Sequence, residues 1–278
     1  ISGVYKDVAV EETDDLMEYL MRVADAKGQM FIFIIDEWDA ICRELVNNKD
    51  AMGDYVNLLR RMFKSSSAAS VFAGVYMTGI LPIKKYKTES ALNNFREYSV
   101  IDPKGLARYF GFTKDEVRML CERHGLEFED MVKWYDGYSI GSEPSMFNPN
   151  SVMEAIAARK CRSYWASTGS FDAVARYIQM DYEGLKTDIV QMLAGGRCSV
   201  KTTRFRNDPN QIMSKDDALT ILIHLGYLAY DEETQKCYIP NREVAGEMEG
   251  AVSETDWTEV ARALDASERL LEDLLAEE

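Results

Sequence analysis

The run Phe31-Ile32-Phe33-Ile34-Ile35-Asp36-Glu37 decides the fold class of this 278-residue chain. A continuous apolar run of this length is typical of a strand in a parallel sheet that helices cover on both faces. A second apolar run, 71–77, has the same character. Between the two runs lies a helical pattern that includes Tyr55, Leu58, Leu59 and Met62. It is long enough for the crossover that two parallel strands require. We therefore expect an α/β fold.

The two carboxylates that follow the first run predict a ligand site. Asp36 and Glu37 come at the carboxyl end of the strand, the edge at which α/β sheets bind their ligands. This is the Walker B pattern. In that interpretation Asp36 holds Mg²⁺, directly or through water, and Glu37 positions and polarises the water that attacks the γ-phosphate.

Thr78 directly follows the second run, at the end of the predicted strand, and adds a third candidate to this site. Its hydroxyl is predicted to lie beside the acidic pair as a polar sensor that contacts the nucleotide. Two structural alternatives remain open at this point. In the first alternative, Thr78 is an ordinary strand-terminal residue with a structural role. In the second, Asp36 caps a helix that begins near Trp38, and Asp39 completes a weak capping box.

The phosphate-binding half of a nucleotide site is absent from this sequence. No GxxxxGK[ST] motif occurs, and Gly195-Gly196 is followed by Arg197-Cys198 rather than by Lys and a hydroxyl residue. Without a phosphate loop, Asp36 and Glu37 face mainly their mutual repulsion and a weakly held metal. We expect no cofactor to bind tightly to this chain alone, and no appreciable ATP hydrolysis by it.

The charge, cysteine content and hydropathy of the chain exclude several classes of partner and site. The formal charge is −15, from 47 acidic and 32 basic residues, so the surface repels phosphate backbones and makes nucleic acid an unexpected partner. The five cysteines form no CxxC pair, which disfavours a disulfide framework or a zinc site and favours a reducing cytoplasm. No apolar run reaches the ~18 residues of a transmembrane helix. We expect a cytoplasmic protein without membrane contact.

The chain is predicted to contain four regions. Residues 1–102 form a partial ATPase core, whose first helix, 13–28, is capped by Thr13 and closed by Gly28. Residues 103–212 form a helical region, with helices around 104–110 and 114–124 and another that Asn150 or Ser151 caps.

The remaining two regions lie towards the carboxyl end of the chain. Residues 213–245 combine a helix capped by Ser214 with a hairpin, which predicts a winged-helix-like module. Its acidic residues favour packing or protein contact over DNA binding. Residues 246–278 form a helix, mainly 254–275, that leads towards a further domain.

The motif Trp134-Tyr135-Asp136-Gly137-Tyr138 permits two interpretations. Aromatic side chains around a tight turn make good stacking or partner surfaces, which favours a recognition loop. An Asp-Gly turn that buried aromatic side chains hold in place is the structural alternative.

Several ordered motifs together resemble the bacterial AAA-ATPase-like family over nearly the whole chain. They are Ile34-Ile35-Asp36-Glu37-Trp38-Asp39, Met77-Thr78-Gly79-Ile80-Leu81-Pro82-Ile83-Lys84, Leu92-Asn93-Asn94-Phe95, Trp134-Tyr135-Asp136-Gly137-Tyr138 and Phe147-Asn148-Pro149-Asn150-Ser151. Members of this family pair a P-loop ATPase region with a C-terminal PD-(D/E)XK nuclease-like domain. The resemblance implies that this chain is the middle part, with the Walker A segment upstream and the nuclease-like domain downstream. It also implies metal and water roles for Asp36 and Glu37 and a sensor role for Thr78.

Two functional hypotheses follow from the sequence. In the first, the parent protein binds and hydrolyses ATP with Mg²⁺ as a regulatory switch, while this chain alone is inactive. In the second, the region is a non-enzymatic scaffold that binds a protein partner or associates with itself and positions the nuclease-like domain, using its acidic surface for specificity.

Overall fold

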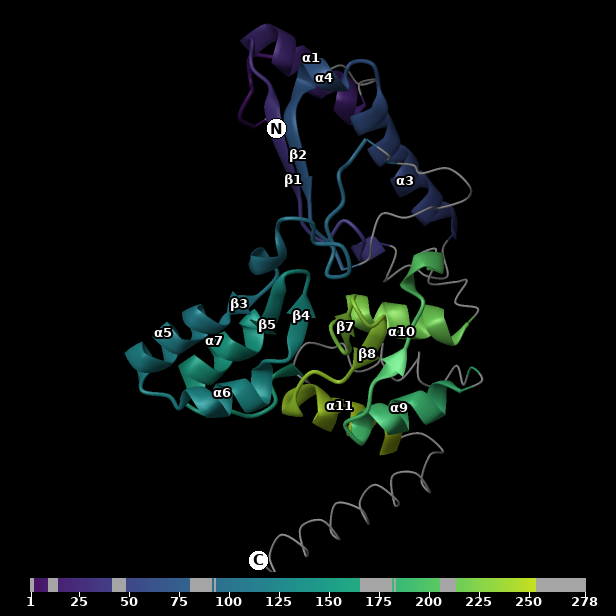
Figure 1. Ribbon diagram of the computed structural model, residues 1–278. Coiled ribbons are helices and arrows are strands. Elements are labelled where there is room, and N and C mark those ends of the chain that lie inside the picture. Colours follow the sequence, from purple (N-terminus) through teal and green to yellow (C-terminus); the bar gives the residue numbers. More distant parts are fainter. Residues whose placement is uncertain are drawn as a thin grey trace, which may run out of the picture. The chain divides into compact units, whose positions relative to one another are not determined.

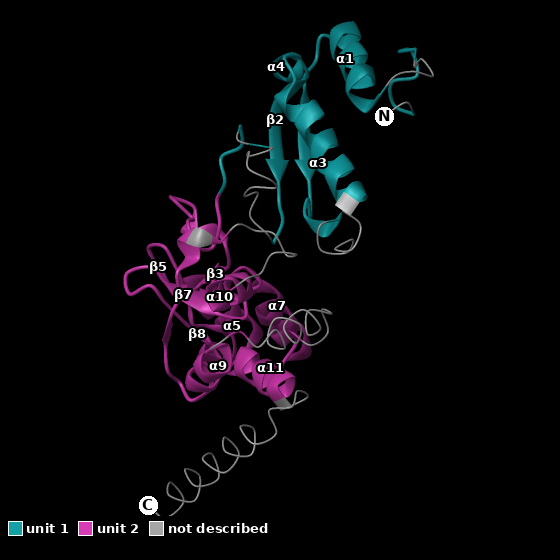
Figure 2. Cartoon of the chain, turned by 90° about the vertical axis from the view of Figure 1, so that its right-hand side faces the viewer, with its two compact units in different colours: residues 1–97, 206–211 teal, residues 98–205, 212–278 magenta. Residues whose placement is uncertain are grey.

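The computed structural model describes residues 3–9, 15–41, 49–80, 92, 94–165, 182, 184–205 and 214–253. The chain is mixed α/β and divides into two compact units (Figure 2). The first comprises residues 1–97 with 206–211, and the second comprises 98–205 with 212–278. The boundary thus falls after residue 97 rather than 102, and the regions predicted beyond it belong almost entirely to one unit.

A pair of parallel strands forms the centre of the first unit. Strand β1, Phe31–Ile35, lies beside β2, Phe72–Met77 (Figure 1). The two strands pair in parallel, and the register places Ile35 opposite Met77. Helices α3, Lys49–Lys64, and α4, Ala68–Val71, make the crossover. The predicted parallel pairing and crossover helix are therefore confirmed. Because the strands run in the same direction, their carboxyl ends meet at one edge.

Only one face of this strand pair is covered by the described residues. Phe33 and Ile35 pack into an apolar core with side chains of α3 and of α1, Leu16–Lys27. Ile32 and Ile34 point to the opposite face and are 74% and 71% exposed, because successive side chains of a strand alternate between faces. For the described residues, the prediction of helices on both faces is wrong.

Helix α1 differs slightly from its prediction. Its N-cap is Asp15, whose carboxylate accepts the Glu18 N–H while the Glu18 side chain accepts the Asp15 N–H, forming a capping box. The predicted cap, Thr13, lies outside the described residues. The helix ends as predicted at Gly28, which adopts the left-handed conformation that favours glycine.

The second unit begins with a region that is not purely helical. Helices α5, Lys114–His124, α6, Phe128–Tyr135, and α7, Pro149–Ala158, surround a three-stranded antiparallel sheet of order β3-β5-β4. Its strands are Phe112–Thr113, Glu143–Phe147 and Tyr138–Ile140. The prediction of a helical region is corrected here. Strands β3 and β4 have only two and three residues, and the sequence of β5, Glu-Pro-Ser-Met-Phe, is neither a continuous apolar run nor an alternating pattern.

Two helix predictions in this region also change. The helix expected around 104–110 is a single 3-10 turn, η1, Ala107–Tyr109. Helix α7 is capped by Asn148, whose side chain accepts the Ser151 N–H, rather than by Asn150 or Ser151. Pro149 follows as its first residue, where a missing N–H leaves no hydrogen bond unmade.

The rest of the second unit packs on one large apolar core. Its elements are α9, Leu185–Leu193; β6, Cys198–Ser199; η3, Thr202–Arg204; α10, Lys215–His224; β7, Ala229–Asp231; β8, Lys236–Tyr238; and α11, Arg242–Ser253. The strands are antiparallel in the order β6-β8-β7. Ser214 caps α10 as predicted, and the predicted hairpin is β7–β8. The predicted helix 254–275 lies outside the described residues.

Helix α10 is buried on all sides. Six consecutive residues, 218–223, are each no more than 3% exposed. An amphipathic surface helix would leave one side in water, so α10 is a core element of this unit. None of the helices in the described part of the chain combines the length and apolar character that a membrane crossing requires.

Candidate functional site

The three predicted site residues gather at the carboxyl end of the β1–β2 pair. The Thr78 hydroxyl donates a hydrogen bond to Asp36 Oδ1. This contact follows from the register, because Asp36 and Thr78 each come one residue after the opposed pair Ile35 and Met77. The Thr78 N–H donates to the Ile35 carbonyl at 2.9 Å, which extends the ladder by one step and fixes the level of both side chains.

Glu37 turns the chain out of the strand in a left-handed conformation, with φ of 51°. A non-glycine residue in this region costs about 1–3 kcal/mol and is found where the surroundings fix the backbone. Here the next residue is fixed by the Trp38 N–H, which donates to the Thr78 carbonyl at 2.9 Å. The Glu37 side chain is exposed, so its carboxylate is accessible at the same edge as Asp36.

Asp39 supports the site from the buried side, a role that the sequence did not reveal. It is fully buried, and its carboxylate accepts the Ile80 N–H at 3.3 Å. Next to this contact lies Gly79, where an added Cβ would sit 2.6 Å from Asp39 Oδ1 and 2.5 Å from Trp38 Cδ1. Residues 38–39 therefore hold the segment 78–80 at a distance that only glycine permits.

The helix-cap alternative for Asp36 fits this geometry less well. Helical backbone begins at Ala40 rather than near Trp38, so Asp39 is the residue that directly precedes the helix. Asp36 Oδ1 instead accepts the hydroxyl of Thr78 and the N–H of Glu37, the latter at 3.1 Å. Both contacts belong to the strand edge.

The donor atoms at this edge suit a hard cation. Within the described residues, no group of three or more His, Cys, Asp or Glu side chains is arranged to hold a metal ion. Mg²⁺, however, usually keeps several waters and takes only one or two carboxylates from the protein. Exposed Asp36, with the Thr78 hydroxyl beside it, fits that limited requirement.

The Asp136-Gly137 turn in the second unit is occupied by structural contacts. Asp136 Oδ1 accepts the Gly137 N–H at 2.7 Å and the Ser145 hydroxyl at 2.8 Å. The Tyr238 hydroxyl donates to the Gly137 carbonyl at 3.0 Å, and Asn241 Nδ2 donates to the Asp136 carbonyl at 2.9 Å. These contacts favour the interpretation as a fixed turn over that as a recognition loop.

Glu243 is a deeply buried carboxylate of the second unit, and no sequence pattern singled it out. The side chain is 1% exposed, and Oε1 accepts the N–H groups of Tyr164 at 2.7 Å and Trp165 at 3.2 Å. Burial raises the pKa of this carboxyl, although these hydrogen bonds and one from Ser151 act to lower it. Its contacts tie α11 to the end of the segment that follows α7.

The second unit also contains an apolar cavity of about 130 Å³. Aromatic and aliphatic side chains form most of its lining, among them Phe110, Tyr138, Phe147 and Trp165. Among its described lining residues, His224 is the one ionisable group apart from two tyrosines, so this cavity offers no pair of carboxylates for acid–base chemistry.

Comparison with known proteins gives little further information. No protein-family model matches the chain, and no solved structure matches it. An uncharacterized protein in the vnfD 5′ region of Azotobacter chroococcum mcd 1 is 25% identical over 158 residues. The aligned part covers 55% of this chain and 30% of the Azotobacter protein.

Proposed function

We propose that this chain carries the metal- and water-handling corner of an ATPase of the P-loop class, within a longer protein that uses ATP hydrolysis as a regulatory switch. The observation that carries the proposal is the contact between Thr78 and Asp36 at the carboxyl end of two parallel strands. This edge is where α/β folds bind ligands.

Each residue has a separate task in this proposal. Asp36 holds Mg²⁺, directly or through water, and the bound ion supplies charge neutralisation at the phosphates. Thr78 fixes the rotamer of Asp36 through Oδ1. Glu37 orients the attacking water and accepts its proton, and the strained backbone at this residue is the kind found where a catalytic side chain is held in position.

A longer form of the protein that includes the upstream phosphate-binding segment provides the test. Glu37→Gln should lower ATP hydrolysis by about 100-fold or more, the usual contribution of a positioned general base. Glu122→Gln, on the exposed side of α5, is the matched control and should leave the rate unchanged. Equal hydrolysis by the Glu37→Gln variant and the unaltered protein would remove the assigned role.

Calorimetric titration of this chain with ATP is the companion measurement. We expect no binding, with or without Mg²⁺, because the backbone donors and the lysine of a phosphate loop are missing from the sequence. Micromolar binding that depends on Mg²⁺, and is lost in Asp36→Asn, would mean that the chain contains a phosphate site of another kind.

A winged-helix-like module is part of the proposal for the second unit. The order α9, β6, α10, β7, β8, with the sheet order β6-β8-β7, supports it. Because α10 is buried, it is not available to enter a DNA groove. This burial and the overall charge of −15 support a packing role for the module without nucleic acid as partner.

The scaffold alternative is favoured by the open face of the β1–β2 pair. Ile32, Ile34 and Tyr76 are 74%, 71% and 64% exposed, and exposed apolar clusters mark protein contact surfaces. The test is sedimentation velocity, which measures the oligomeric state of this chain and of an Ile34→Lys variant at several concentrations. A concentration-dependent dimer that the substitution abolishes would support self-association through this face, and monomers in both cases would count against it.

A further inference from the structure

The sheet β6-β8-β7 places two cysteines directly opposite each other. Cys198 on β6 and Cys237 on β8 are register partners in an antiparallel pair, and both thiols are free. Partners of this kind have Cα atoms about 4.5–5.5 Å apart. A disulfide spans Cα separations of about 4.4–6.8 Å, so the Cα atoms of this pair lie within the range of a disulfide.

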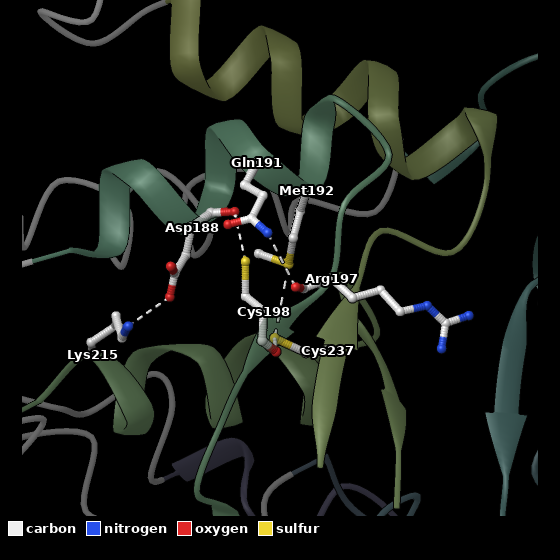
Figure 3. A network of polar contacts seen from close by, with 7 residues as sticks. All are labelled: Asp188, Gln191, Met192, Arg197, Cys198, Lys215 and Cys237. Carbon is white, nitrogen blue, oxygen red and sulfur yellow. Dashed lines mark hydrogen bonds and ion pairs between the residues drawn. The ribbon is translucent and has the colours of Figure 1, made fainter. Parts of the chain in front are cut away.

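Both sulfur atoms lie in the layer between the sheet and helix α9 (Figure 3). Cys198 Sγ donates to the Asp188 carbonyl at 3.3 Å. Cys237 Sγ lies 3.8 Å from Met192 Sδ and 3.6 Å from the Cys198 carbonyl. Asp188 and Met192 are one turn apart on α9, so the two thiols face the same helix.

Access to the pair comes through β6. This strand has two residues and lies at the edge of the sheet, whereas β8 lies in the middle. Short edge strands open at little cost in free energy compared with the centre of a sheet. Cys198 is therefore the thiol that opening exposes first, and Cys237 is the thiol that stays in place to react with it.

We propose that Cys198 and Cys237 form a thiol-oxidation site, which closes to a cross-strand disulfide by exchange with a low-molecular-weight disulfide. The Cys198 thiolate attacks one sulfur of that disulfide, forms a mixed disulfide and releases one small thiolate. The Cys237 thiolate then attacks Cys198 Sγ and releases the second. The small disulfide is reduced to two thiols, which take up the two cysteine protons.

The surroundings of the pair suppress its reaction while β6 stays paired in the sheet. Burial raises the pKa of Cys198 to about 11 and that of Cys237 to about 12, so thiolate is scarce at neutral pH. Asp188 also raises both pKa values, whereas Lys215 acts to lower them, and Lys236 further lowers that of Cys198. The ion pair between Lys215 and Asp188, at 2.7 Å, reduces the effect of the Lys215 charge on the two thiols.

The cross-link would change the second unit in a defined way. Cys198 and Cys237 are 39 residues apart, and the closed loop contains η3, α10 and β7. Oxidation would therefore fix β6 to β8 and hold α10 within one covalent ring. The inference does not depend on the proposed nucleotide site, because it rests only on elements of the second unit.

The test is oxidation of the full chain with glutathione disulfide at mildly alkaline pH, followed by thiol counting in denaturant. The protein has five cysteines, and we expect three alkylatable thiols after oxidation, with one cross-linked peptide that joins Cys198 and Cys237. Cys198→Ala and Cys237→Ala should each prevent the cross-link. Cys161→Ala is the matched control and should leave it unchanged.

Two results would overturn the proposal. Five free thiols after oxidation, at a pH and denaturant concentration at which amide exchange shows β6 to open, would show that the pair does not close. A cross-link that involves Cys42, Cys121 or Cys161 would show that oxidation proceeds elsewhere. Circular dichroism of each variant establishes that the alanine substitutions leave the fold intact.

Discussion

The Asp36-Glu37 edge of the first unit resembles the Asp136-Gly137 turn of the other unit in sequence. Each has an aspartate that directly follows two large hydrophobic residues at the end of a strand or helix and begins a change of chain direction. In the structure the two aspartates differ in their hydrogen bonds to the rest of the protein. Asp136 is held by a hydroxyl, its own turn N–H and a contact from a residue 105 positions away. Asp36, by contrast, is exposed, and its described hydrogen bonds all lie at the strand edge.

The backbone shows the same contrast. At Gly137 a left-handed conformation, with φ of 107°, is taken by the residue type that adopts it without strain. At Glu37 a left-handed conformation is imposed on a residue that it strains, at an accessible edge. The Asp136-Gly137 motif therefore has a structural role. At the Asp36-Glu37 motif the strained backbone does not serve stability, which is typical of a functional site.

Gly137→Ala should give the largest loss of stability. An added Cβ would lie 1.9 Å from the Pro240 carbonyl oxygen, so the turn and the β8–α11 connection cannot both keep their positions. We expect a loss of about 3–5 kcal/mol, measured by urea unfolding. Gly125→Ala is the control, because that left-handed glycine has nothing within 4 Å of the added Cβ, and about 1 kcal/mol is expected there. Similar losses for the two variants would contradict the packing argument.

Alanine substitutions of Asp136 and Asp36 compare how much each aspartate contributes to the free energy of unfolding. Asp136→Ala removes the acceptor of the Ser145 hydroxyl and of the Gly137 N–H and should cost about 2 kcal/mol. Asp36→Ala removes an exposed side chain and should change stability by no more than about 0.5 kcal/mol. Peptide-resolved hydrogen exchange reports each unit separately. If Asp36→Ala proved the more damaging, Asp36 would be the structural residue of the two.

Glu37→Gly should have a smaller effect on stability than Gly137→Ala or Asp136→Ala, and of opposite sign. Glycine adopts the left-handed conformation without strain but loses more chain entropy on folding, so we expect a net gain of about 0.5–1 kcal/mol. Slower hydrogen exchange in residues 31–41 would report it. Glu37→Ala keeps the strain and serves as the control. A destabilised Glu37→Gly variant would mean that the glutamate side chain itself stabilises this edge.

Local patterns predicted the parts of the fold whose signals are local. Apolar runs of strand length predicted the β1–β2 pair, and helical spacing predicted α3 between them. Cap residues placed the beginning of α10 at Ser214 and the end of α1 at Gly28. The sheet β3-β5-β4 was missed because β3 and β4 have only two and three residues and β5 shows neither a continuous apolar run nor alternation.

The candidate site was predicted only in part. Asp36, Glu37 and Thr78 follow strand ends, and the sequence alone placed them at one edge once the strands were taken as parallel. Asp39 was missed as a supporting residue because its burial and its bond to the Ile80 N–H depend on a segment 41 positions away. Nothing in the local sequence indicates such a contact.

The sequence by itself determined the parallel strand pair, the helix between its strands and the acidic character of its edge, because periodicity, capping and composition act over a few residues. Tertiary structure alone decided which face of that pair stays open, that α10 is buried on all sides, and that Cys198 meets Cys237 although no cysteine spacing suggests a pair. These features depend on contacts between residues far apart in the chain, where the hydrophobic effect selects burial without leaving a local sequence signal.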